Sequence, residues 1–156
     1  MHLRIVAVGK KMPDWVQTGV TEYSKRLPRD MRLEWVEVPP AKRQQGGSEA
    51  QFREHEAAAI ERQLKEGGTL VALDVAGKIV ATEDIADSLA GWQMNGDKVT
   101  LLIGGPDGLH PPLLSRCQQR WSLGRITLPH PLVRVVLAEQ LYRAWSLNAG
   151  HPYHRG

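Results

Sequence analysis

The sequence predicts an α/β domain with a largely parallel sheet and helices on both faces. Short apolar runs alternate with helical patterns along the whole chain, which is the signature of strand–helix–strand units. The run at residues 99–103 is the most apolar of these, as expected of a central parallel strand. The chain has 156 residues without a repeat or linker, which fits a single domain.

The first third of the chain predicts a strand, a helix and a second strand. Residues 3–8 form a short buried run, and Pro13 suits the first turn of the helix that follows. Residues 33–38 alternate apolar and polar side chains, which is typical of a strand. A basic, glycine-containing loop is expected over residues 41–47, and it could contact a partner.

The middle of the chain predicts two helices on either side of a strand. Ser48 and Gln51 form a capping box, so a helix is expected from this point to about Glu66. Residues 69–75 are rich in Leu and Val and predict the strand. Thr82 is expected to cap the next helix.

The C-terminal third predicts a short helix over residues 112–119, an extended segment over residues 123–128 and a long helix from Pro131. The long helix is apolar on nearly every side, except for a narrow stripe at Glu139, Arg143 and Ser146. Such a helix is expected to be buried on more than one face. We therefore expect it to pack on its own core and on a second subunit, as in a homodimer.

Positive charge is concentrated in the C-terminal part of the chain. Residues 1–99 carry a net charge of −1, whereas residues 100–156 carry +4, and every cation in that second segment is an arginine. Guanidinium groups bind phosphate and stack on bases better than ammonium groups do. The charge therefore fits either a solvated basic face or an anionic partner such as nucleic acid.

Three glycine-containing segments lie near the ends of predicted strands, at residues 73–77, 103–108 and 123–128. Ligands of parallel sheets bind at the carboxyl ends of the strands, and glycine lets the backbone approach a ligand closely. A tight turn would explain any one of these segments. Three of them in one small domain indicate a pocket.

Several classes of function lack their sequence signals. The chain has neither a Gly-x-Gly-x-x-Gly fingerprint nor a phosphate loop, which argues against dinucleotide oxidoreductases and P-loop NTPases. No Cys/His set has zinc spacing, so no metal is expected. Cys117 is the single cysteine, expected as a small buried hydrophobe. The apolar run at the N-terminus is too short for a signal peptide or membrane span, and we expect a cytoplasmic protein.

The last residues are unusually rich in groups that bind RNA. Residues 151–155 read His-Pro-Tyr-His-Arg and combine an aromatic ring, two imidazoles and a guanidinium. Gly150 is expected to end the long helix, so that the tail can leave the body and reach another surface. From composition alone, a disordered chain end is slightly favoured.

These features together resemble a known family. The matching residues are Val6-Ala7-Val8-Gly9-Lys10, Leu73-Asp74, Ile103-Gly104-Gly105-Pro106-Asp107-Gly108-Leu109, Leu128-Pro129-His130-Pro131 and the His-Pro-Tyr-His-Arg end. Over essentially its whole length the chain resembles the bacterial large-subunit rRNA pseudouridine methyltransferases of the SPOUT superfamily, the RlmH-like family.

The resemblance implies a specific fold and reaction. It implies one SPOUT domain over residues 1–156 with a C-terminal trefoil knot, in which residues 149–156 form an active-site tail. It also implies a homodimer that binds S-adenosylmethionine in the knot. The substrate would be a pseudouridine of 23S rRNA in the assembled ribosome, methylated at the ring imide nitrogen.

The resemblance also implies which residues bind the cofactor. They are Leu73, Gly104, Gly105, Leu123, Gly124, Arg125, Ile126, Thr127 and Leu128. The pair Gly124-Arg125 departs from what close relatives often carry, and Arg125 would add positive charge beside the pocket. No function is carried onto residues 41–66, which match more loosely.

The acceptor nitrogen must lose a proton, and histidine is the natural base near neutral pH. We expect His154 to take this role at the active site of the other subunit. Tyr153 and Arg155 would place the pseudouridine base and its phosphate. Arg143 and His130 are candidates for RNA contact. The alternatives are an ion pair of Arg143 with Glu139 and a local structural role for His130 at the helix start.

Two other functions compete with this one. A non-catalytic RNA-binding or ribosome-binding module would explain the charge equally well, but it would not need the glycine-lined pocket. A small-molecule enzyme that uses another nucleotide is disfavoured by the absent phosphate loop.

Overall fold

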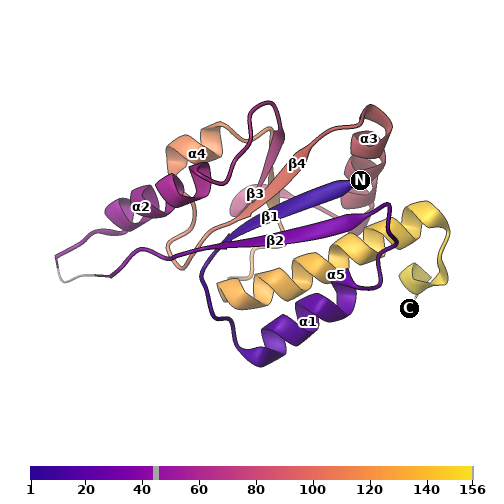
Figure 1. Cartoon of the computed structure of the whole chain (residues 1–156), viewed down its shortest axis with the longest axis horizontal. Coiled ribbons are helices and arrows are strands. Elements are labelled where there is room, and N and C mark those ends of the chain that lie inside the picture. The colour runs from indigo at the N-terminus through magenta and orange to yellow at the C-terminus, as the bar shows by residue number, and fades with distance from the viewer. Residues whose placement is uncertain (44–45, 156) are drawn as a thin grey trace.

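The computed structural model describes residues 1–43 and 46–155, which form a five-stranded parallel sheet in the order β2-β1-β4-β3-β5 (Figure 1). The strands are β1 (His2–Val8), β2 (Arg32–Val38), β3 (Thr69–Ile79), β4 (Val99–Ile103) and β5 (Gln119–Ser122). The helices are α1 (Asp14–Ser24), α2 (Glu49–Glu61), α3 (Thr82–Asn95), α4 (Pro111–Ser115), α5 (His130–Ala149) and the 3₁₀ helix η1 (Pro152–Arg155). The predicted α/β class is confirmed, and β4 is the central strand as predicted.

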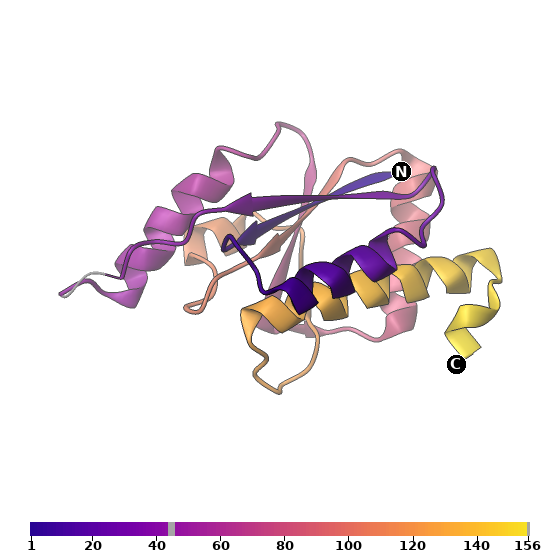
Figure 2. The same ribbon diagram turned by 60° about the horizontal axis from the view of Figure 1, so that its bottom comes forward.

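The helices cover both faces of the sheet (Figure 2). On β1, Leu3 and Ile5 point into a core shared with α3 and α5, whereas Val6 and Val8 point into a second core shared with α2 and α4. This division follows from the alternation of side chains along a strand. The sheet is therefore the middle of three layers, and its strands are apolar on both sides.

Other elements of the same chain cover the apolar surface of helix α5. It packs between α1 and α3 and against the sheet, and Leu137, Leu141 and Ala144 are fully buried. Burial on more than one face is confirmed. The expected polar stripe is wrong at Ser146, which is fully buried and whose hydroxyl donates to the Arg143 carbonyl. Because α1 and α3 supply the cover, the apolarity of α5 does not require a second subunit.

Two segments near the C-terminus differ from the sequence prediction. The extended segment expected over residues 123–128 is wrong, because the strand lies earlier, at β5, and the chain then bends without regular structure. Strand β5 pairs with β3, which continues to Ile79 rather than ending near residue 75. The short helix α4 is correspondingly confined to Pro111–Ser115. Pairing with β3, a long-range contact, sets these boundaries.

Helix caps were predicted with mixed success. The capping box of Ser48 and Gln51 is present, but α2 ends at Glu61 rather than near Glu66. Thr82 is not the cap of α3. Its hydroxyl donates to Gln140 on α5, while the Asp84 carboxylate accepts from the backbone N–H that precedes the helix.

Two further predictions can be compared with the structure only over the residues that it describes. Gln44 and Gln45 of the expected basic loop, and Gly156 of the tail, lie outside them. In residues 1–43 and 46–155, no helix is long and apolar enough to span a membrane.

Candidate functional site at the carboxyl edge of the sheet

Parts of the three glycine-containing segments surround one cavity of about 460 Å³, at the carboxyl ends of β4 and β5 and beside the middle of β3. This volume lies within the range of roughly 300–1,000 Å³ typical of small-molecule sites. Its wall includes residues 73–75 within β3, residues 103–109 from the last residue of β4 onward and most of residues 121–128. The structure thus brings the predicted segments together at the edge where parallel sheets bind ligands.

Glycines are sterically required in this wall. A Cβ on Gly104 would lie 2.8 Å from the carbonyl carbon of Gly108, because the loop after β4 folds back on itself. Gly108 has φ of +80° and donates its N–H to the Gly105 carbonyl at 3.0 Å. Only glycine adopts that conformation readily. At these glycines the loop therefore presents backbone without side chains, while Pro106, Asp107 and Leu109 also line the cavity.

Four ionisable side chains line the cavity, namely Arg53, Asp74, Asp107 and His130. Asp107 pairs with Arg43 at 2.5 Å, so Asp74 is the carboxylate that favours a positively charged ligand. Burial lowers the pKa of His130 below its ordinary value, and the nearby Arg134 cation lowers it further. His130 is therefore neutral at neutral pH and can form hydrogen bonds without bringing positive charge to the cavity.

Eight of the nine residues predicted to bind a cofactor line this cavity. They are Leu73, Gly104, Gly105, Leu123, Gly124, Ile126, Thr127 and Leu128. The ninth, Arg125, does not line the cavity. Its guanidinium donates to the Val75 carbonyl and so connects residues 123–128 to β3.

The predicted tail residues lie elsewhere. Residues 150–155 line no part of the cavity, and Figure 1 shows them at the end of α5 opposite to the carboxyl edge of the sheet. Gly150 ends α5 with φ of +69°, as predicted. The expectation that the tail leaves the body is wrong, because η1 folds back against α5.

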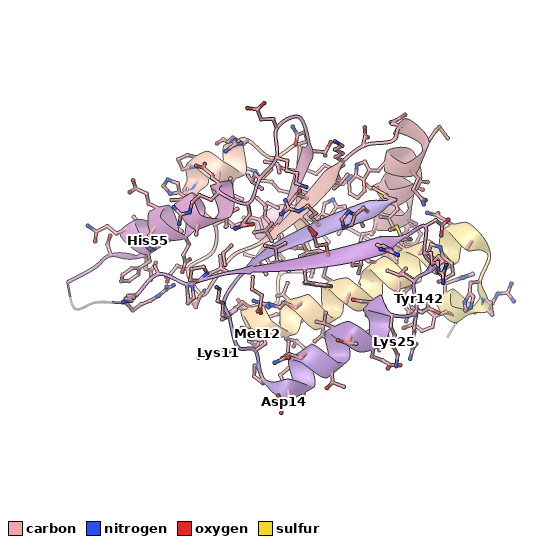
Figure 3. All side chains as sticks on the ribbon, in the orientation of Figure 1. Lys11, Met12, Asp14, Lys25, His55 and Tyr142 are labelled. Atoms are coloured by element: carbon pink, nitrogen blue, oxygen red, sulfur yellow. The ribbon has the colours of Figure 1, made fainter. Side chains whose placement is uncertain are left out.

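Aromatic packing and one carboxylate account for this position of the tail. The Tyr153 ring lies 4.5 Å from that of Tyr142, which Figure 3 labels on α5. The Tyr153 hydroxyl donates to Glu139 at 2.7 Å. Burial and the Glu139 carboxylate raise the pKa of Tyr153 to about 12. Tyr153 is therefore neutral and held in place, while His154 and Arg155 follow it on the same turn.

The two predicted RNA contacts lie in different settings. Arg143 forms the i,i+4 pair with Glu139, at 2.9 Å, and its guanidinium lies 4.9 Å from the Tyr153 ring centre. This arrangement agrees with the alternative of an ion pair. His130 starts α5 and also lines the cavity, so it is more than a local residue of the helix start.

Sequence reasoning missed the contribution of residues 41–66. Arg53 on α2 lines the cavity, and its Nη1 lies 3.4 Å from the Asp107 carbonyl. The buried Glu56 lies directly behind the same loop. The available signal was Glu56 itself, a carboxylate directly before Ala57-Ala58-Ala59 on the predicted helix. Within the described parts of the chain, no cluster of three or more His, Cys, Asp or Glu side chains has metal-binding geometry.

Comparisons with known proteins agree with this architecture. A family model described as "Predicted SPOUT methyltransferase" matches residues 1–154. Proteins named "Ribosomal RNA large subunit methyltransferase H" are similar to the chain over nearly its full length. The one from Chromohalobacter salexigens is 54% identical over 155 residues, which cover 99% of this chain and 100% of that protein.

Two more relatives with the same name are 48% identical over 155 residues. For the Hahella chejuensis protein the match covers 99% of both chains. For the Marinomonas protein it covers 99% of this chain and 100% of the relative.

A solved structure adds support at the level of the fold. It is titled a probable methylase family protein from Haemophilus influenzae, with a TM-score of 0.59 at 11% identity. The match covers 97% of this chain and 69% of that one. The resemblance found in the sequence is thus confirmed, and the chain belongs to the SPOUT methyltransferase family.

Proposed function

We propose that this protein methylates the ring imide nitrogen of a pseudouridine in 23S rRNA of the assembled ribosome, with S-adenosylmethionine as the donor. One observation carries the proposal. Two glycine-containing loops and the middle of β3 enclose a small-molecule cavity in a chain that aligns over nearly its full length with proteins named rRNA methyltransferases. An rRNA substrate also places the proposed activity in the cytoplasm.

The cavity suits the proposed donor. S-adenosylmethionine, when bound, supplies a methyl group already activated on a positively charged sulfonium. The side chain of Asp74 brings negative charge to the wall, which favours a cationic ligand, whereas the charge of Asp107 is paired with Arg43. The exposed backbone of the loop after β4 and of residues 123–128 offers N–H and C=O groups for its polar parts. A trefoil knot around these loops, as in the family, is part of the proposal.

The acceptor requires proton removal and orientation. The imide nitrogen is protonated at rest, and His154 is the proposed base that accepts this proton. Tyr153 stacks on or orients the pseudouridine base, and Arg155 binds a phosphate next to that nucleobase. These groups align the nitrogen with the methyl carbon, and positioning of this kind supplies much of the rate enhancement in a displacement reaction.

A site that uses both the cavity and the tail requires two copies of the chain. Helix α5 has 20 residues and so extends for about 30 Å between His130 at the cavity and the turn that starts the tail. We therefore propose a homodimer in which the tail of each copy completes the cavity of the other. The exposed Trp15 and Ile126 side chains, 58% and 79% accessible, lie near the carboxyl edge and suit such a contact.

Methyl transfer from labelled donor to intact ribosomes and to separated subunits, followed by mapping of the modified base, tests the reaction. Calorimetry with S-adenosylmethionine alone tests the cavity. Deletion of Tyr153–Arg155 should abolish transfer and leave donor binding intact. A protein that binds ribosomes but neither binds nor uses the donor is a binding module, which refutes the proposal.

Mixed dimers test the composite site. One copy carries the tail deletion and the other carries Gly104→Ala in the cavity wall. If the tail acts in the partner's site, the mixed dimer has one intact cavity and one intact tail facing it, and activity returns. If the tail acts in its own chain, neither copy is complete and the mixture stays inactive.

A further inference from the structure

The loop after β4 is held from behind by a part of the chain that carries no assigned role. The inner face of this loop, residues 104–108, lines the cavity. Its outer face meets α2, on which Figure 3 labels His55, and the segment that precedes α2. A small set of charged side chains makes these contacts.

Glu56 is the buried anchor of this contact. Its side chain is 2% exposed, and its Oε2 accepts hydrogen bonds from the Ala41 N–H at 2.9 Å and from Arg43 at 2.8 Å. The other oxygen, Oε1, would lie 3.2 Å from a Cβ on Gly105. A Cβ at this position would therefore press on the carboxylate behind the loop, which would have to shift by a few tenths of an ångström. A charge buried this deeply requires a cationic partner, which Arg43 provides.

Arg43 connects the anchor to the cavity wall. While Nη1 binds Glu56, Nη2 donates to the Asp107 carboxylate at 2.5 Å. The guanidinium also stacks over Phe52 of α2 at 4.9 Å, which restricts its orientation. The planar fork of arginine thus bridges two carboxylates, an arrangement that lysine cannot reproduce.

We propose that Arg43 is a positioning residue for the donor-binding loop, acting through the chain of contacts Glu56–Arg43–Asp107. It holds Asp107 and the backbone of residues 104–108 in the geometry that binds the donor. The inference rests on the proposed function. It predicts that Arg43 sets donor affinity and leaves the chemical step unchanged, since no atom of Arg43 lines the cavity.

Arg43→Gln and Arg116→Gln form the matched pair for the test. Arg116 pairs with Glu61 on the same helix α2 at 3.1 Å, and neither lines the cavity. Loss of one charge-assisted contact to the loop should weaken donor binding about tenfold in Arg43→Gln, measured by calorimetry. The KM for the donor should rise by the same factor, while kcat at saturating donor stays unchanged. Arg116→Gln should match the parent protein.

Two further variants keep the test decisive. Arg43→Lys should restore only part of the affinity. The double variant Arg43→Gln/Asp107→Asn should bind the donor about as weakly as the weaker single variant, since both changes break one contact. Full additivity of the two losses would overturn the proposal. So would an unchanged donor affinity with a raised KM for ribosomes, which would make Arg43 an RNA contact instead.

Amide hydrogen exchange separates this inference from the proposed function. In the ligand-free protein, amides of residues 104–109 should exchange faster in Arg43→Gln than in Arg116→Gln. Failure of the parent protein to bind S-adenosylmethionine would refute the proposed function alone. Equal exchange of the loop in both variants would refute the role of Arg43, whatever the donor is.

Discussion

The carboxylate of Glu139 is expected to determine where the C-terminal tail lies. Its Oε2 accepts from the Tyr153 hydroxyl at 2.7 Å and from Arg143 Nε at 2.9 Å, and its side chain is 19% exposed. Hydrogen bonds to charged groups contribute about 1.5–3 kcal/mol each when they are largely buried. Glu139→Gln removes the charge that strengthens both bonds. Because glutamine still accepts a hydrogen bond of about 0.5–1.5 kcal/mol, the free energy of tail opening should fall by about 1–1.5 kcal/mol.

Amide hydrogen exchange of the tail measures this change. The His151 N–H donates to the Ser146 carbonyl at 2.9 Å, so its exchange reports on tail opening. Because each 1.4 kcal/mol is a factor of ten, exchange should accelerate by roughly 5- to 12-fold. Glu61→Gln is the control, since Glu61 also pairs with an arginine, Arg116, but on the exposed surface of α2. Equal protection of the tail in both variants would refute the role of Glu139.

Further predictions concern stability and pH. Gly104→Ala places a Cβ 2.8 Å from Gly108 and should lower the free energy of unfolding by about 1–3 kcal/mol, measured in denaturant, along with donor affinity. Gly91 lies in α3 with open space around it, so Gly91→Ala should raise the free energy of unfolding by about 0.5–1 kcal/mol. Ser48→Ala removes the capping box and should cost about 1 kcal/mol in the same assay.

Burial raises the pKa of Glu139, but hydrogen bonds from Tyr153 and other donors outweigh this effect and leave the pKa lowered. Protection of the tail amides from exchange should therefore persist at neutral pH and disappear as the pH falls through the pKa of Glu139. Tyr153 has a raised pKa of about 12, so its contribution should be complete below the ordinary tyrosine pKa and disappear as pH rises through 12. Tail protection that increased at either extreme would contradict this assignment.

Local patterns predicted the elements that depend on neighbouring residues. Ser48 and Gln51 satisfy the first N–H groups of α2 whatever packs on that helix, and the apolar run of β4 is buried in any parallel sheet. The segments around the cavity were also recognisable, because glycine near a strand end reports on the backbone itself. Thr82 was misassigned because Gln140, 58 residues away, binds its hydroxyl.

The amino-acid order was sufficient for the α/β class, for the segments that meet at the carboxyl edge and, through resemblance, for the SPOUT methyltransferase family. Four features emerged only from the folded chain. They are the strand order, the cover that α1 and α3 place over α5, the folded-back tail and the bridge from Glu56 through Arg43 to Asp107. The physical reason is sequence distance. Periodicity and caps report on residues a few positions apart, whereas these contacts join residues that only packing brings together.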